Sequence, residues 1–81
     1  MDFNQILKEV TNIYRDVLDN ESITLTPETT AMDIDEWDSL SHIELVVAME
    51  KHFKIKFTAV EIQSWTNVGA LVKNIEKKLN G

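Results

Sequence analysis

The 81-residue chain has no cysteine, only one proline and only two glycines. Without cysteine it cannot form a disulfide, a thiolate nucleophile or a zinc–thiolate cluster, so any thiol chemistry must come from a cofactor. No stretch approaches the roughly 20 apolar residues of a membrane span, and residues 1–5 lack the basic start and apolar run of a signal peptide. We therefore expect a cytoplasmic protein that does not insert into membranes.

Basic residues are absent from one long segment. Residues 16–50 contain ten acidic side chains and neither Lys nor Arg, whereas residues 51–81 contain six lysines against Glu61 and Glu76. The acidic segment makes nucleic acid a poor partner. Two explanations stay open for it: the acids simply keep a small domain soluble, or they dock onto basic patches of partner enzymes.

The spacing of apolar residues predicts an all-α fold, a small four-helix bundle formed as a single domain by residues 1–81. A first helix is expected over residues 3–18, where apolar residues recur at helical intervals. Residues 19–37 contain the only proline and many Thr, Asn, Asp and Ser residues, which predicts a long ordered loop with a short turn after Pro27. Four apolar residues should attach this loop to the core: Ile23, Leu25, Met32 and Ile34.

The second half of the chain is expected to hold two further main helices and one short helix. The second helix should cover residues 39–53 and be followed by an extended connector in which Ile55 and Phe57 point away from the neighbouring lysines. Thr58 and Glu61 have capping-box spacing for a short third helix that ends near residue 64. A last helix should follow over residues 68–79, with Thr66 as its cap and Asn80 and Gly81 ending it.

One serine stands at the start of the predicted second helix, directly after the acidic loop. The segment reads Trp37-Asp38-Ser39-Leu40-Ser41-His42-Ile43-Glu44-Leu45. An Asp-Ser pair at a helix start is by itself most often only a cap, because these side chains accept hydrogen bonds from unpaired backbone N–H groups. Behind it, five apolar residues have spacings that suit one helical face: Leu40, Ile43, Val46, Val47 and Phe53.

This segment resembles the signature of acyl carrier proteins, and the order long helix, long loop, helix, short helix, helix matches that family over nearly the whole chain. The resemblance implies that Ser39 carries a 4'-phosphopantetheine arm whose thiol holds acyl groups as thioesters, and that Asp38 supports the phosphopantetheinyl transferase that attaches it. It also implies a monomeric carrier without catalytic activity that serves acyl-loading and acyl-transfer enzymes with basic docking patches. The residues that match the family's recognition surface are Leu40, Glu44, Val47 and Glu50.

Departures from the family pattern bear on the pathway. Trp37 stands where many fatty-acid carriers have a small residue or glycine, and the Gly-Gly pair common in peptidyl carriers is absent. The Trp-Asp-Ser-Leu segment is more similar to stand-alone carriers of specialised pathways, such as polyketide-like, amino-acid-derived or saccharide-modifying assembly, than to the housekeeping carrier. Two alternatives stay open: an aminoacyl or peptidyl carrier, and an unmodified acidic helical interaction module. Five residues could line the interior where fatty carriers shelter an acyl chain, although we expect them to be core: Ile43, Val46, Ala48, Val68 and Leu71.

Neither a resident metal nor a catalytic centre is expected. Asp33, Asp35 and Glu44 have the spacing of EF-hand positions 1, 3 and 12, but the glycine that the tight turn requires is missing. Ser39 and His42 could pair as nucleophile and base, but no glycine-rich elbow surrounds the serine.

The histidines and tryptophans have ordinary structural interpretations. His42 and His52 are expected at the surface. Trp37 is expected to pack at the end of the loop, and Trp65 should cover the core near the third helix, because large aromatics usually anchor the packing of a small bundle.

Overall fold

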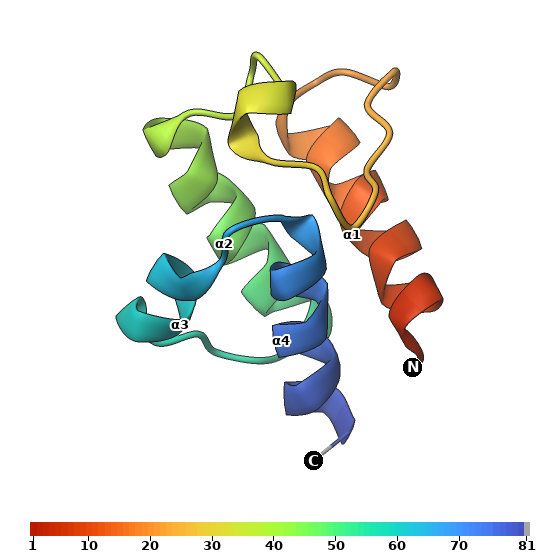
Figure 1. The fold of residues 1–81 in the computed structure, drawn as a ribbon, viewed down its shortest axis with the longest axis vertical. Coiled ribbons are helices and arrows are strands. Elements are labelled where there is room, and N and C mark those ends of the chain that lie inside the picture. The colour runs from red at the N-terminus through yellow and green to blue at the C-terminus, as the bar shows by residue number, and fades with distance from the viewer. Residues whose placement is uncertain (81) are drawn as a thin grey trace.

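The structure, a computed structural model, describes residues 1–80, and the regular secondary structure of these residues is entirely helical (Figure 1). The elements are α1 (Phe3–Val17), the 3-10 turn η1 (Ala31–Asp33), α2 (Ser39–Phe53), α3 (Ala59–Ser64) and α4 (Val68–Asn80). No strand occurs among these residues, so the predicted all-α fold is confirmed. Gly81, which was predicted to end the last helix, lies outside the described residues.

Three long helices enclose the core. The helix α1 packs against both α2 and α4, and the short α3 packs against α4. Burial of an aliphatic or aromatic side chain contributes about 1.5–3 kcal/mol, so this interior is the main source of stability. The side chains that are essentially inaccessible to solvent are Ile6, Val10, Tyr14, Leu45, Met49, Val68, Leu71, Val72 and Ile75.

The helix ends follow local hydrogen-bonding rules. The predicted capping box of α3 is confirmed, because Thr58 Oγ1 accepts from the Glu61 N–H at 3.1 Å and a Glu61 carboxylate oxygen accepts from the Thr58 N–H at 2.9 Å. The prediction of Thr66 as the cap of the last helix is wrong. Asn67 caps α4 instead, with its Oδ1 accepting from the Ala70 N–H at 2.9 Å. The connector before α3 has Ile55 and Phe57 packed against the core, as predicted.

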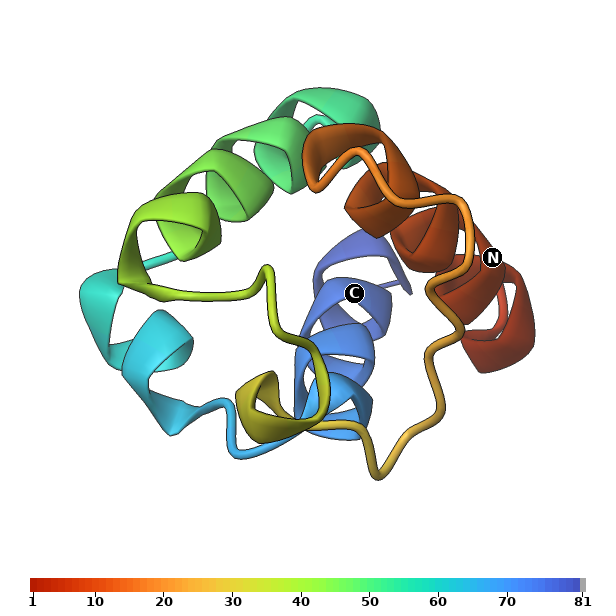
Figure 2. The same ribbon diagram turned by 90° about the horizontal axis from the view of Figure 1, so that it is seen from above.

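The long loop between α1 and α2 crosses one end of the bundle (Figure 2). It is tied to the start of α4, where the Pro27 carbonyl accepts from the Gly69 N–H and the Thr29 carbonyl accepts from the Val68 N–H, both at 2.8 Å. A turn at Pro27 is closed by the Thr29 N–H on the Thr26 carbonyl. The predicted attachment of the loop is confirmed at three residues: Ile23, Leu25 and Ile34. It is wrong for Met32, which is 93% exposed on η1.

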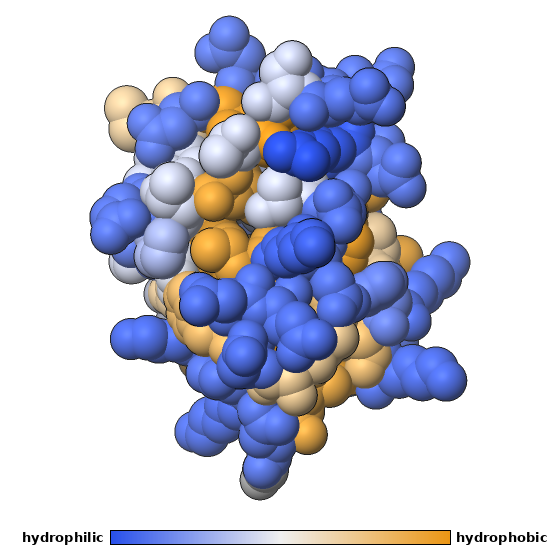
Figure 3. All heavy atoms as spheres, turned by 90° about the vertical axis from the view of Figure 1, so that its right-hand side faces the viewer, coloured by the Kyte–Doolittle hydropathy of each residue, from blue (hydrophilic) through white to orange (hydrophobic). Residues whose placement is uncertain are grey.

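On the side where α1 lies, hydrophilic residues cover much of the surface, and hydrophobic residues show in patches among them (Figure 3). None of the helices within residues 1–80 is long and apolar enough to cross a membrane.

Candidate functional site

Two polar side chains cap the start of α2. Asp38 Oδ1 accepts hydrogen bonds from the backbone N–H groups of Leu40 and Ser41, at 3.0 and 2.9 Å. Ser41 Oγ accepts from the Asp38 N–H at 2.9 Å and donates to the Glu36 carbonyl at 2.8 Å. The hydrogen bond from the Ser41 N–H is the main reason that the pKa of the Asp38 carboxyl lies below its usual value. Asp38 is therefore an ionised cap.

Ser39 lies between these two capping residues and takes no part in the cap. It is exposed at the first residue of α2, and its hydroxyl has no hydrogen bond to any other residue in the described part of the chain. The sequence left open whether Asp38 or Ser39 caps the helix, and the structure assigns that role to Asp38. The Ser39 hydroxyl thus remains free at the positive end of the helix dipole, where a negatively charged substituent is favoured.

The solvent-facing side of α2 is apolar as well as acidic. Leu40, Ile43 and Val47 are 70%, 63% and 43% exposed, and Glu44 lies exposed among them. These residues fall on one face of the helix, because steps of three and four residues return to the same side. The resemblance implies that Leu40, Glu44 and Val47 belong to a recognition surface, and all three are exposed.

The prediction of a single apolar face on α2 is wrong. The side that faces the core consists of Leu45, Val46, Met49 and Phe53, so the helix is apolar on two sides. Ile43, predicted as core, lies on the outer side. Ala48 is only partly buried at the edge of the core.

Glu50 differs from the other predicted recognition residues. Its side chain is partly buried, and its carboxylate accepts a hydrogen bond from the Phe57 N–H at 2.9 Å. The same residue's carbonyl accepts from the N–H groups of Lys54 and Ile55 at the end of the helix. Glu50 therefore fixes the chain after α2.

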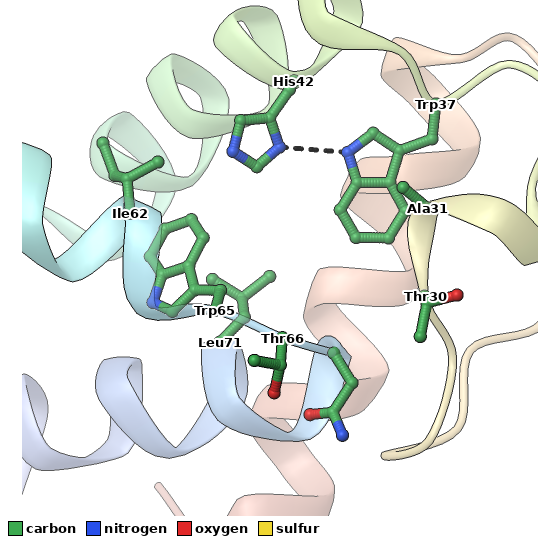
Figure 4. Close-up of a pocket in the computed structure, with 9 residues that line it drawn as sticks. Thr30, Ala31, Trp37, His42, Ile62, Trp65, Thr66 and Leu71 are labelled. Atoms are coloured by element: carbon green, nitrogen blue, oxygen red, sulfur yellow. Dashed lines mark hydrogen bonds between the residues drawn. The ribbon is translucent and has the colours of Figure 1, made fainter.

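A row of aromatic rings extends from α1 past the start of α2 to the end of α3. Trp37 packs edge-on against buried Tyr14, with ring centroids 5.0 Å apart. Its indole Nε1–H donates to His42 Nδ1 at 3.0 Å, and the His42 ring meets Trp65 at a centroid distance of 6.0 Å (Figure 4). The packing roles predicted for Trp37 and Trp65 are confirmed, since both pack against the core.

The two histidines have different environments. The surface prediction is wrong for His42, because this side chain is half-buried among the aromatic rings, and burial lowers the pKa of its imidazole. No hydrogen bond joins it to Ser39 within residues 1–80, and its Nδ1 is already occupied by Trp37. This arrangement provides no support for a nucleophile–base pair. His52 is exposed, as predicted, and its Nε2 lies 2.6 Å from a Glu9 carboxylate oxygen.

The acidic loop forms no metal site in the part of the chain that the structure describes. No group of three His, Cys, Asp or Glu side chains is suitably placed there. Asp33 instead closes the turn at η1, where its carboxylate accepts from the Thr30 N–H at 2.9 Å.

Comparison with known proteins identifies the family. Residues 8–75 match the family model described as a phosphopantetheine attachment site. The chain belongs to the acyl carrier protein family. It is 32% identical over 74 residues to an acyl carrier protein of Picosynechococcus sp., covering 91% of each chain. It is 31% identical over 75 residues to an acyl carrier protein of Thermotoga maritima, covering 93% of each.

A solved relative extends this agreement to three dimensions. The solution NMR structure of the holo acyl carrier protein from Geobacter metallireducens is 53% identical and superposes with a TM-score of 0.87. The match covers 91% of this chain and 85% of that one. The family's cofactor is 4'-phosphopantetheine, and Ser39 fits its attachment, because its hydroxyl is exposed and free of competing hydrogen bonds.

Proposed function

We propose that Ser39 is the residue to which 4'-phosphopantetheine is attached, and that the single domain over residues 1–81 delivers acyl groups to biosynthetic enzymes without catalysing a reaction itself. The observation that supports this proposal is the contrast at the start of α2, where Asp38 and Ser41 are held in the cap and the Ser39 hydroxyl is free. When bound, the group supplies a flexible arm whose thiol holds the acyl cargo as a thioester.

The chain's own residues contribute position and charge to the loading reaction. The Ser39 Oγ forms a new bond to the phosphorus of coenzyme A that bears the pantetheine. The bond to the adenosine bisphosphate leaving group breaks, and the serine proton passes to a base on the transferase. The helix dipole then favours the phosphodiester. Asp38 keeps this helix end ordered, and its exposed, ionised carboxylate is available to help bind a metal ion of the transferase. We also propose that the carrier acts in the cytoplasm, where coenzyme A is available, and that it acts as a monomer.

The loading experiment has a matched control in the same turn of the helix. The purified chain is incubated with coenzyme A, Mg²⁺ and a broad-specificity phosphopantetheinyl transferase, and the intact mass is measured. We expect one phosphopantetheinyl unit on the wild-type chain and on Ser41→Ala, and none on Ser39→Ala. No gain on a folded wild-type chain would favour the unmodified interaction module instead. A gain retained by Ser39→Ala would place the attachment at another residue.

We further propose that partner enzymes recognise the outer face of α2 through Leu40, Ile43, Glu44 and Val47. Its exposed apolar side chains lie next to acidic residues, which suits a partner surface with an apolar centre and a basic rim. Glu50, which is engaged by the Phe57 N–H, contributes less than predicted. Glu44→Lys should slow loading by the transferase on the order of ten-fold at low salt, whereas Glu76→Lys on α4 should not. Equal rates for the two variants would contradict this docking face.

A further inference from the structure

A groove lies at the far end of α2 from Ser39, where the helix passes into the connector to α3 (Figure 1). It is open to solvent and has a volume of about 380 Å³. Two apolar residues line it, Val47 and Ile55. Three basic residues line it as well, and we call it the lysine groove after them: Lys51, Lys54 and Lys56. The groove therefore combines apolar surface with positive charge.

The three lysines of the groove have no acidic partner within the chain. All three are exposed, and the ion pairs within residues 1–80 have only His52 and Lys78 as their basic members. The one carboxylate that lines the groove belongs to Glu50, and it accepts a hydrogen bond from the Phe57 N–H at 2.9 Å. The described part of the chain thus leaves the charge of the groove without an ion-pair partner.

The stability of α2 explains only part of this charge. A lysine in the last turn of a helix complements the helix dipole, and this explanation is sufficient for Lys51. Lys56 lies beyond the helix, where the effect of the dipole has decayed. Lys54 holds the left-handed conformation with φ 57°, in which glycine costs less than lysine. The positive charges at positions 54 and 56 therefore have no role in the helix itself.

The lysine groove continues the outer face of α2. Glu44, Val47, Lys51 and Lys54 follow one another at steps of three and four residues, so they lie on the same side of the helix. With a rise of about 1.5 Å per residue, Glu44 and Lys54 are about 15 Å apart along the axis. The screening length at physiological ionic strength is only about 8 Å. A docked partner therefore meets two separate regions of opposite charge.

The chemistry of the groove favours a protein as its occupant. An inorganic anion would pair with the lysines but leave Val47 and Ile55 uncovered, whereas a protein surface supplies both carboxylates and apolar side chains. A stable interface covers about 800 Å² on each partner, so an occupant of this groove has to extend along the outer face of α2 as well. Val47 belongs to both surfaces and makes them continuous.

We propose that the enzymes that dock on α2 face Glu44 with a basic group and face the lysine groove with an acidic group of two or more Asp or Glu side chains. The two contacts of opposite sign fix the direction in which an enzyme lies along α2, because the reverse direction brings like charges together. This inference rests on the proposed docking face. It goes beyond that face because it adds a second contact and excludes partners that are basic along their whole docking surface.

The test uses two synthetic helical peptides of about 20 residues, roughly 30 Å long, with the same row of leucines. The first has arginines at one end and glutamates at the other, and the second has arginines at both ends. Each is titrated into the isotope-labelled chain at an ionic strength of about 0.15 M, and the NMR shifts along α2 give the dissociation constant. We expect the first peptide to bind about 3–10-fold more tightly. The net charge of −6 alone would favour the second.

Changing the charge of the groove should change this preference. Glutamate at positions 51, 54 and 56 should make the peptide with arginines at both ends the tighter ligand. Glutamine at the same three positions should remove the preference, and this milder variant serves if the first does not fold. The control places glutamate at three exposed lysines of α1 and α4 that do not line the groove, and it should keep the wild-type preference: Lys8, Lys73 and Lys77.

Several results would overturn the proposal. These are equal binding of the two peptides to the wild-type chain, tighter binding of the peptide with arginines at both ends, and a preference that survives in the folded glutamine variant. Without a peptide preference, binding to phosphatidylglycerol vesicles that the glutamine variant loses would identify a membrane surface as the occupant instead. Concentration-dependent shifts at Glu44 and Lys51 without any peptide would identify a second copy of the chain.

A second measurement uses the enzymes that naturally load the carrier. The chain with phosphopantetheine is incubated with an extract of the cells that make it, and the intact mass gives the rate of acylation. We expect the glutamine variant of the groove to be acylated about 3–10-fold more slowly than wild type, and glutamine at Lys8, Lys73 and Lys77 to have no effect. Equal rates for the two variants would refute an acidic group on these enzymes.

The two measurements distinguish this proposal from the proposed function. The peptide titration needs no attached arm, so Ser39→Ala should give the same peptide preference as the wild-type chain. A preference in Ser39→Ala together with a wild-type chain that no transferase loads would support the groove and contradict the attachment at Ser39. Normal loading without any peptide preference would refute the groove and leave the attachment proposal intact.

Discussion

Replacement of Gly69 by alanine tests how the long loop is held against α4. In the interior of an exposed helix this change stabilises a protein by about 0.4–1 kcal/mol, because alanine loses less backbone entropy on folding. At Gly69 the added Cβ would lie 2.9 Å from the Pro27 carbonyl oxygen and 3.2 Å from the Pro27 Cβ. The first contact involves backbone, so the loop must move. The shift would also strain the 2.8 Å hydrogen bond from the Gly69 N–H to that carbonyl.

Overpacking of this kind costs about 1–3 kcal/mol, which exceeds the propensity gain, so we expect Gly69→Ala to lower the free energy of unfolding by about 1–2 kcal/mol. For a domain of this size the melting temperature should fall by roughly 4–8 °C for each kcal/mol. Urea denaturation followed by circular dichroism measures the change, with Lys73→Ala at an exposed position of α4 as the control. A Gly69→Ala protein that is more stable than wild type would refute the close approach of the loop.

Three further substitutions test local features of the fold. Lys54 ends α2 with φ 57°, a left-handed backbone conformation that glycine adopts at lower cost. Lys54→Gly should therefore raise the free energy of unfolding by about 0.5–1 kcal/mol in urea denaturation, and a loss of stability would contradict the left-handed cap. The Tyr14 hydroxyl is buried with no hydrogen-bond partner among residues 1–80, so Tyr14→Phe should raise the free energy of unfolding by about 1 kcal/mol, and a loss of stability would contradict the unpaired hydroxyl. Hydrogen bonds from Asn74, the Thr58 N–H and Lys78 lower the pKa of Glu61 to about 2. The stabilisation by the Glu61 carboxylate should be complete above its ordinary value of 4.5 and disappear as pH falls toward 2, so Glu61→Gln should flatten the acid side of the stability profile. Identical slopes for Glu61→Gln and wild type between pH 5 and 2 would contradict this.

Local signals in the sequence predicted most of the fold. Helical spacing and the Thr58 and Glu61 capping pair are properties of short segments, and the structure confirms the helices they predicted. The error at the start of α4 has a local cause as well. Thr66 and Asn67 can both cap a helix, and the choice depends on which side chain reaches the Ala70 N–H.

Exposure within an apolar helix could not be predicted in the same way. Leu40, Ile43, Val46 and Val47 are similar in hydrophobicity, yet only Val46 is buried. The difference comes from tertiary packing, because α1 packs against one side of α2 and the other side is open to solvent. Met32 was misplaced for a related reason, because η1 turns its side chain outward although the loop on either side is anchored.

The position of Ser39 followed from the sequence, but its immediate surroundings did not. A serine beside an aspartate at a helix start is equally compatible with a cap, and only the hydrogen bonds show that Asp38 and Ser41 fill that role. The pocket lined by Trp37, His42 and Trp65 (Figure 4) was also beyond prediction, since its walls come from residues as far apart as Thr30 and Leu71. The burial of His42 depends on this same convergence of distant segments.

The most direct test of the central claim is the mass of the protein isolated from the cells that make it. The purified chain is digested, and the peptide that contains Ser39 is fragmented in a mass spectrometer. We predict one phosphopantetheinyl unit on Ser39 and an unmodified Ser41 in the same peptide. A chain that is unmodified at Ser39 in cells shown to carry phosphopantetheine on other carriers would contradict the account.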